Sequence, residues 1–324
     1  MNTPPTDGIR VAPDDLCALV AAIFEKVPIP AAHAELIAGL LVDTDLRGVV
    51  SHGVNSVERY VRSFREGSAN THPEVEILQE GPVNAALNGD GGMGMMVASR
   101  AMHMAIDKAR ELGVGIATTT YHDHIGSAGK YVRMALAQDL IGIVFSGRSA
   151  APAYKSEATI QASVQGDPPM AFGMPSGPQR PPFLLDMGSG MLGGAAFEKM
   201  PDLFFKSIGL SHVANIMSGT LGGQMLPQFD RRRTHYKGAD QSAFFLALDI
   251  ERFVPLAAFK DNVDHLLDEV GKMQPFPGYA EATLPGGPEW KRERQYAAAG
   301  IPLSAAIAAS LQKVAAEFGL TPPW

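Results

Sequence analysis

Apolar residues recur at helical spacing through the first 70 residues of the chain. Within residues 14–26, which follow Pro13, one helical face collects Leu16, Leu19, Val20, Ile23 and Phe24. The same period predicts two further helices, over 31–46 and 55–66, joined by the short loop 47–54. The start of the chain is therefore expected to be a helical unit.

From residue 75 onward, predicted strands alternate with predicted helices. We expect strands at 75–78, 83–88, 114–120, 140–146, 182–187 and 242–250, and helices at 94–112, 127–138, 207–218, 256–272 and from 288 to the end. Such alternation indicates an α/β layer with at least some parallel pairing. In the helix 256–272, the side chains expected to point inward are Phe259, Val263, Leu266 and Leu267.

Residues 147–182 are rich in proline, glycine, serine and alanine and show little periodicity. This composition predicts a long ordered loop. Long loops in compact enzymes usually line a functional site. We therefore expect this segment to border the site.

Length and charge narrow the class of protein. The chain has 324 residues, 46% of them apolar, which is enough for two compact units with a cleft between them. The formal net charge is -7, and the basic residues are scattered except at Arg231–Arg233. A nucleic-acid-binding protein would need a basic stripe to neutralise phosphates. We expect no nucleic-acid partner.

The chain also lacks the marks of a membrane or secreted protein. Its longest apolar runs, such as residues 37–42, fall far short of the roughly 20 residues that a membrane span requires. The first ten residues have no charged start followed by an apolar run, as a secretory signal would. The single Cys17 cannot form an internal disulfide. A cytoplasmic protein without a membrane partner is expected.

The glycine-rich stretch 89–94, GDGGMG, matches the pattern G-x-G-x-x-G between a predicted strand and a predicted helix. Such glycines can let a backbone approach a pyrophosphate at a helix N-terminus. However, the next strand ends in Thr118, Thr119 and Thr120, without the acidic residue of a dinucleotide-binding fingerprint. We therefore interpret the stretch as a turn with a tight helix entry.

The tripeptide Ser51-His52-Gly53 lies on a loop between two predicted helices. A side chain there can face a cleft while rigid elements hold it. A lone histidine is also often structural, so the tripeptide by itself leaves both interpretations open.

A second histidine segment, His122-Asp123-His124, follows a predicted strand and precedes Gly126 and a helix. In α/β proteins this is where groups that bind ligands are presented, and His124 is a candidate for a catalytic or substrate-orienting role. With Asp186 as a third ligand, the two histidines could alternatively bind a metal. Asp186 ends the strand 182–187, where it could orient a histidine or raise its pKa, or simply cap a turn.

Several motifs together resemble one family. They are D-x-D-L-R-G-V-x-S-H-G at 43–53, L-N-G-D-G-G-M-G at 87–94, the strand and histidine segment 114–129, F-L-L-D-M at 183–187, F-F-L-A-L-D at 244–249 and L-P-G-G-P-E at 284–289. In this order they resemble the type-2 malate/L-lactate dehydrogenase family, which includes ureidoglycolate dehydrogenase, 2,3-diketogulonate reductase and sulfolactate dehydrogenase. The resemblance spans nearly the whole chain.

The resemblance implies a homodimer with a non-Rossmann, mixed-sheet α/β domain for NAD or NADP, over residues 75–250. A helical substrate domain would then be assembled from residues 1–74 and 251–324. Under the same resemblance, His52 is the proton donor or acceptor at C2 of a small anionic substrate, a 2-oxo or 2-hydroxy acid or related imino acid. His124 and Asp186 line the same catalytic site.

The resemblance also nominates binding residues. Residues 187–193 would approach the nucleotide, and Lys206 matches a lysine near the cofactor. The substrate-binding candidates are Arg47, Ser51, Ser56 and Arg59, and the cofactor-binding candidates are Asp167, Met187, Gly188, Ser189, Phe205 and Lys206.

The chain also departs from the family pattern. Ser56 stands where the family usually has an arginine suited to a substrate carboxylate, and Asp167 places a negative charge near the expected phosphates. Between Asp186 and Lys206 the family carries roughly forty residues, and this chain has only the short run 188–205. Part of the cofactor-binding wall is therefore expected to be missing.

Three functions follow from these observations. The first is an NAD(P)-dependent oxidoreductase in which the cofactor exchanges a hydride with C2 while His52 handles the proton. The second is a cofactor-independent isomerase, racemase or lyase that uses the same acid/base residues, which the short run favours. The third is a catalytically silent homologue, against which the two histidines argue.

Overall fold

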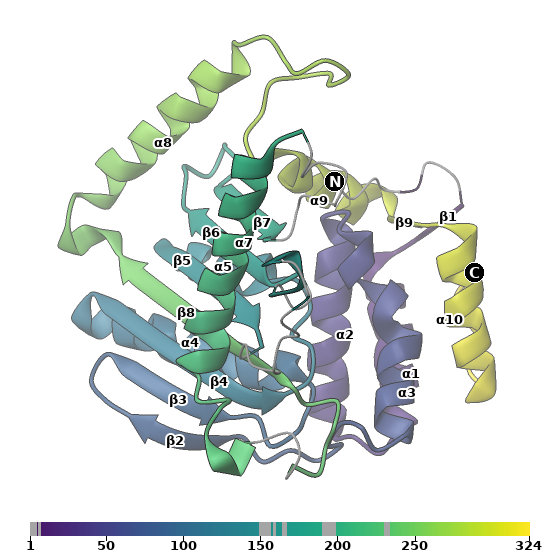
Figure 1. Cartoon of the computed structure of the whole chain (residues 1–324). Helices are drawn as coiled ribbons and strands as arrows, with labels where there is room; N and C mark the ends of the chain where they lie inside the picture. Colours follow the sequence, from purple (N-terminus) through teal and green to yellow (C-terminus); the bar gives the residue numbers. More distant parts are fainter. Residues whose placement is uncertain are drawn as a thin grey trace.

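The computed structural model describes residues 5, 8–148, 157, 160–163, 167–189, 199–229 and 234–324. A mixed β-sheet forms one half, and a group of helices from both ends of the chain lies beside it (Figure 1). The helices are α1 (Pro13–Glu25), α2 (Ala31–Leu46), α3 (Val57–Arg65), α4 (Gly94–Leu112), α5 (Gly129–Leu136), α7 (Pro201–Asn215), α8 (Leu256–Gly271), α9 (Gly287–Ala299) and α10 (Ala305–Glu317).

The large sheet has seven strands among the described residues, in the order β2-β3-β4-β8-β5-β6-β7. Among the strands of the described residues, β3 and β4 pair in parallel and the other neighbours pair antiparallel. This mixed order differs from the all-parallel Rossmann sheet, as expected from the sequence. The strands are β2 (Glu76–Glu80), β3 (Asn84–Asn88), β4 (Val114–His122), β5 (Leu140–Gly147), β6 (Pro169–Met174), β7 (Phe183–Gly188) and β8 (Gln241–Asp249).

Helices α4 and α5 cover one face of this sheet and share a core with it. Glycines let the helices come close: a side chain at Gly115 would collide with the Ala105 backbone, and one at Gly173 with Val132. The glycine-rich turn before α4 serves the same purpose, because a side chain at Gly94 would strike the Asp123 carbonyl. The interpretation of this stretch as a tight turn agrees with that packing.

The other face of the sheet carries α7 and a smaller core of Phe145, Met170, Ala214 and Phe244. The helix expected at 207–218 begins earlier, at Pro201, because proline suits the first turn of a helix. It then passes into one π-type turn, Ile216–Thr220. The expectation of a loop throughout 147–182 was wrong, because residues 169–174 form strand β6.

The helical half is built from both chain ends. Its core joins residues of α1, α2 and α3 to C-terminal residues such as Tyr296, Leu303 and Leu311. The short strands β1 (Ile9–Val11) and β9 (Ile301–Leu303) pair antiparallel and link the two ends directly. This union agrees with a domain made from both ends, while its boundaries at 74 and 251 stay a prediction.

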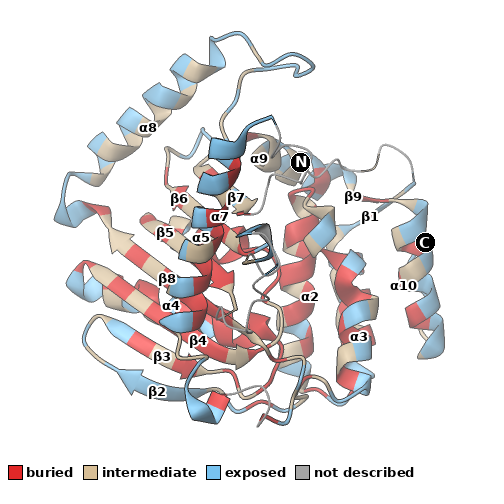
Figure 2. Ribbon diagram, viewed as in Figure 1, coloured by how far each residue is buried: buried red, intermediate tan, exposed pale blue. Residues whose placement is uncertain are grey.

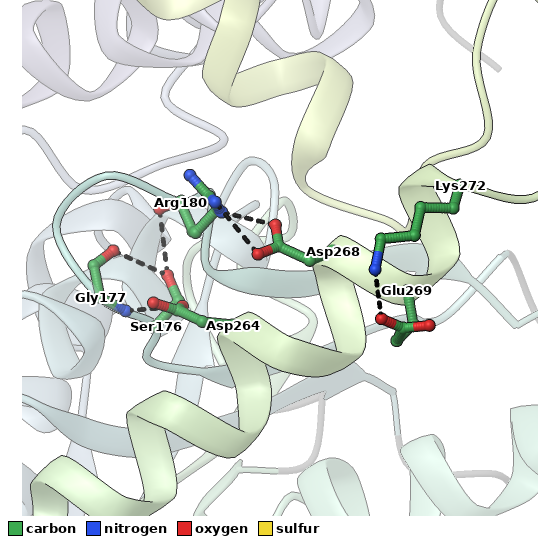
Figure 3. Close-up of polar contacts among 7 residues, drawn as sticks. All are labelled: Ser176, Gly177, Arg180, Asp264, Asp268, Glu269 and Lys272. Atoms are coloured by element: carbon green, nitrogen blue, oxygen red, sulfur yellow. Dashed lines mark hydrogen bonds and ion pairs between the residues drawn. The ribbon is translucent and has the colours of Figure 1, made fainter.

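Helix α8 differs from the other helices. It was expected to turn Phe259, Val263, Leu266 and Leu267 inward, but none of its residues is buried (Figure 2). Leu266, for example, is 51% exposed. Polar contacts hold it instead: Asp264 accepts from the Gly177 N–H at 2.9 Å, and Asp268 pairs with Arg180 (Figure 3). The inward prediction failed because periodicity indicates an apolar face but not what covers it.

Across the described ranges, no helix is both long and apolar enough to cross a membrane.

Candidate functional site

A cavity of about 1040 Å³ lies where the two halves of the molecule meet. Its wall combines the end of α2, the turn that carries His52, the loop after β4, the ends of β5 and β7, and the segment 270–289. The volume is at the upper end of the range for small-molecule sites. Residues far apart in sequence, His52, His124 and Asp186, all line it.

His52 ends the 3₁₀ turn Val50–His52, which follows α2. Buried Asp45 shapes this turn, because its carboxylate accepts from the Val54 N–H at 2.6 Å and packs where any side chain at Gly53 would collide. Ser51 Oγ lies 2.8 Å from His52 Nδ1. The other ring nitrogen, Nε2, has no hydrogen-bond partner among the described residues, so it is available to a ligand.

His124 is held on one side only. Its Nδ1 atom lies 2.7 Å from Tyr60 Oη, 3.1 Å from Arg59 Nη2 and 3.2 Å from the Gly126 N–H. Since these groups donate, Nδ1 must be unprotonated and the neutral ring carries its proton on Nε2. Burial, together with the nearby Arg59, holds the pKa of His124 well below its usual value.

The two rings stack, with centroids 5.6 Å apart and planes 29° from parallel. Burial, followed by the charges of Lys130 and Arg59, lowers the pKa of His52 as well, while Asp167 opposes this shift. Two adjacent imidazoles also disfavour a shared positive charge. Near neutral pH the pair is therefore a proton acceptor next to a hydrogen-bond donor.

Asp186 sits near the end of β7 and opens onto the cavity. Its Oδ2 accepts from the Gly129 N–H at 2.9 Å, at the first turn of α5. Burial by the surrounding protein raises the pKa of its carboxyl despite Arg133 and Lys130 nearby. Among the described residues it is hydrogen-bonded to neither histidine, so it does not set their tautomers directly.

The substrate-binding candidates divide into two groups. Arg47 lines the cavity, pairs with Glu293 at 2.5 Å, and keeps a buried Nη2 without a partner among the described residues. Ser51 and Arg59 contact the two histidines. Ser56, however, is buried against Tyr60 and does not line the cavity.

The cofactor-binding candidates also divide. Asp167, Met187 and Gly188 line the cavity, whereas buried Ser189 bonds to Pro168 and Ser211. Phe205 and Lys206 lie on the exposed side of α7 and are not part of the cavity wall. Residues 190–193, and with them half of the short run 188–205 that stands in place of the family's longer stretch, lie outside the described residues.

The metal alternative has no support in the part of the chain that the structure describes. No group of three possible ligands occurs there. His122 is fully buried, and both its ring nitrogens already have partners, Thr119 Oγ1 at 2.8 Å and the Asp123 carbonyl at 2.7 Å. His122 therefore supports the loop that presents His124.

The sequence pattern of the malate/L-lactate dehydrogenase family matches residues 11–201 and 190–312. This chain belongs to that family. It is an oxidoreductase by membership, as the sequence motifs predicted. The two matches meet at residues 190–201, inside the stretch where family residues were expected to be missing.

Individual members of the malate/L-lactate dehydrogenase family align along nearly the full chain. Malate dehydrogenase of Pyrococcus horikoshii is 29% identical over 352 positions, covering 96% of each chain. L-sulfolactate dehydrogenase of Methanocaldococcus jannaschii is 26% identical, covering 95% of this chain and 97% of that protein. The solved structure of the Pyrococcus horikoshii enzyme superimposes with a TM-score of 0.84, at 28% identity over 99% of both chains.

The structure adds residues to which the sequence analysis assigned no role. Lys130 and Asp45 are buried behind the histidine pair, and Arg133 and Arg148 lie on the cavity wall. A charged residue inside the apolar helix 127–138 was a readable signal for Lys130. No local pattern pointed to the far wall, where Met273, Phe276 and Tyr279 face the histidines' cavity.

Proposed function

We propose that this protein is an NAD(P)-dependent dehydrogenase of a small 2-hydroxy acid, or a reductase of the matching 2-oxo or imino acid. The observation that carries the proposal is the stacked His52–His124 pair on the wall of a cavity large enough for a small acid and a nicotinamide ring. Family membership supports the same reaction class. The relatives named above act on malate and sulfolactate.

His52 would handle the proton. Its Nε2 faces no partner among the described residues, and its lowered pKa keeps the ring neutral near pH 7. It can therefore accept the hydroxyl proton of a 2-hydroxy acid, and return it when the reaction runs toward the hydroxy acid. His124, whose proton is confined to Nε2, would donate a hydrogen bond to the oxygen on C2.

Arg47 would hold the substrate carboxylate. One arm of its guanidinium is paired with Glu293, while Nη2 is buried and unpartnered among the described residues. A buried N–H without an acceptor is unfavourable, and a carboxylate relieves this with a charge-assisted hydrogen bond. This arrangement would replace the arginine that the family usually has at the position of Ser56.

The cavity fits the nicotinamide end of a nucleotide, because its volume of about 1040 Å³ exceeds what a small acid fills. When bound, that group would exchange a hydride with C2 of the substrate. Asp167, Met187 and Gly188 would contact it from the β6–β7 side of the cavity. Asp186, on the same wall, would orient the polar edge of the ring or of the substrate.

We also propose that the enzyme is a cytoplasmic homodimer, as expected from the sequence. Exposed apolar side chains on α7 agree with an interface there: Leu203, Leu210 and Val213 are 42–49% exposed. Light scattering of the purified protein would measure twice the mass of one chain. A monomer would remove this part of the proposal.

The first test is a calorimetric titration of the cofactor-stripped protein with NADH and with NADPH. Micromolar binding supports the dehydrogenase and leads to a screen of 2-oxo acids by absorbance. The absence of binding at millimolar nucleotide would contradict the proposal and favour the cofactor-independent alternative, for which exchange of substrate protons with deuterated water is the readout.

A further inference from the structure

Lys130 is a buried charged residue that the proposed reaction does not use. It lies on α5, its side chain is 2% exposed, and its Nζ atom has no hydrogen-bond partner among the described residues. It does not line the cavity. The Nζ atom lies 6.0 Å from the centroid of the Tyr131 ring, but a buried ammonium group without a hydrogen-bond partner is still unfavourable for folding. Its presence here suggests a functional reason.

The position of Nζ gives that reason. It lies against Gly126, at the place where a side chain on that residue would collide with it. The N–H of the same glycine donates to His124 Nδ1 at 3.2 Å. Lys130 thus packs against the loop that presents His124 and is not part of the cavity wall.

Lys130 is also electrostatically linked to every catalytic candidate. After burial, its charge is the next largest cause that lowers the pKa of His52, and it contributes to the lowered pKa of His124. It opposes the raised pKa values that burial imposes on Asp186 and Asp45. Burial lowers the pKa of Lys130 to about 7, and the negative charges of Asp186 and Asp45 partly offset this effect.

We propose that Lys130 is a positioning residue of this site: from behind the loop, its ammonium group repels positive charge from the His52–His124 pair and keeps both rings available as neutral groups. It acts through the histidines and does not touch the substrate. Because it carries its charge below about pH 7, it acts in the range where unperturbed histidines would take up a proton. For its catalytic consequence the inference rests on the proposed function.

Other charged groups face the same residues and must be held constant in any test. Arg59 from α3 and Arg148 after β5 also disfavour protonation of His124, and Asp167 favours that of His52. Three further charged residues act on the groups around the histidines. Arg133 lowers and Glu289 raises the pKa of Asp186, and Asp123 raises the pKa of Tyr60.

The decisive experiment follows the histidines themselves and needs no substrate. The full-length protein, labelled with ¹⁵N in its nine histidines, is titrated from pH 4.5 to 9 by long-range ¹H–¹⁵N NMR. His52→Gln and His124→Gln assign the two signals. The comparison is between wild type, Lys130→Met, which removes the charge at similar length, and Lys130→Arg, which keeps it.

In Lys130→Met we expect both titration midpoints to rise, by on the order of one pH unit, whereas in Lys130→Arg they stay at or below the wild-type values. Lys130→Met should also be at least as heat-stable as the wild type, because an apolar side chain replaces a buried charge. Unchanged midpoints in a folded Lys130→Met protein would overturn the inference. If that variant does not fold, Lys130→Gln is titrated under the same criterion.

Two further measurements separate this inference from the proposed function. The acid limb of kcat/KM for 2-hydroxy acid oxidation should move to higher pH with the His52 midpoint in Lys130→Met. If the NMR midpoints move and the limb does not, the proposed role of His52 fails while that of Lys130 stands. A borohydride-trapped pyruvate adduct on Lys130 would overturn the positioning role, because the amine would then touch the substrate.

Discussion

The His52–His124 pair and the C-terminal end of α8, at Val270, line the same cavity, but different interactions hold them in place. The histidines rest on buried groups: Tyr60 is 1% exposed and bonds to His124, and the Asp45 carboxylate shapes the His52 turn. Helix α8 is held by surface ion pairs, such as Arg180–Asp268 at 2.7 Å (Figure 3) and Lys260–Asp139 at 2.6 Å. Beyond it, Phe276 is 81% exposed.

Buried hydrogen bonds and close packing define one geometry, whereas exposed ion pairs stabilise little and are weakened by salt. We therefore expect the proposed proton transfer on the wall that carries His52 and His124, which we call the rigid wall, and other substrate contacts on the wall formed by the end of α8 and residues 270–289, the loosely held or distal wall. We infer that the distal wall can adapt to substrates of different length without disturbing the proton transfer. Mutations on the two walls should accordingly differ in the size of their effects and in whether they change catalysis, substrate binding or stability.

The largest effect is expected at His52. Because an acid/base group contributes about 10²-fold to 10⁴-fold to rate, His52→Asn should lower kcat by at least about 10²-fold and leave the melting temperature unchanged. Steady-state assays measure this, with His72→Asn as the matched control on the surface. A variant that keeps the wild-type rate would remove His52 from the mechanism.

The rigid wall should also be sensitive to acid. Burial lowers the pKa of His122 from its usual 6.5 to about 4, so between these values the unfolded chain binds a proton that the folded one does not. The contribution of His122 to the free energy of unfolding is therefore fully present above pH 6.5. It is lost as the pH drops from 6.5 to 4, and the total loss is about 3 kcal/mol.

Urea unfolding at pH 7 and at pH 5 tests this loss. In His122→Gln the difference between the two pH values should shrink, because the buried imidazole is gone. An equal loss in the variant and the wild type would assign the acid sensitivity to other groups.

At Arg47 the effect should appear in binding. Arg47→Gln removes the proposed carboxylate contact, so KM for a 2-hydroxy acid should rise roughly tenfold or more while kcat changes less. Arg62→Gln, an exposed arginine outside the cavity wall, is the control. A fall in kcat at constant KM would instead place Arg47 in the reacting geometry.

The smallest effect is expected on the loosely held wall. Arg180→Gln breaks the pair with Asp268, in which both side chains are exposed, so the melting temperature should move by less than about 2 °C. Hydrogen exchange of the α8 amides should nevertheless become faster. A loss of stability as large as that of a core mutation would show that α8 is packed as firmly as the histidine wall.

Local patterns were enough to predict much of this protein. Helix α4 runs from Gly94 to Leu112 as its periodicity indicated, and the six motifs taken together predicted the family and nominated His52, which lines the cavity. Such features can be read because they depend on neighbours in sequence: side-chain period, helix-starting residues and short motifs.

Tertiary structure decided the rest. Strand β6 forms in a proline- and glycine-rich segment because two neighbouring strands supply its hydrogen bonds. Helix α8 is held by polar contacts to a distant turn, the Gly177 N–H and the Arg180 guanidinium, and not by apolar packing. The surroundings of Lys130 Nζ come from three separate parts of the chain: Asp45 on α2, Asp186 on β7 and Gly126 in the loop after β4. Contacts between residues far apart in sequence leave no periodic trace, so the sequence pointed to a histidine that lines the cavity but not to the buried charge near it.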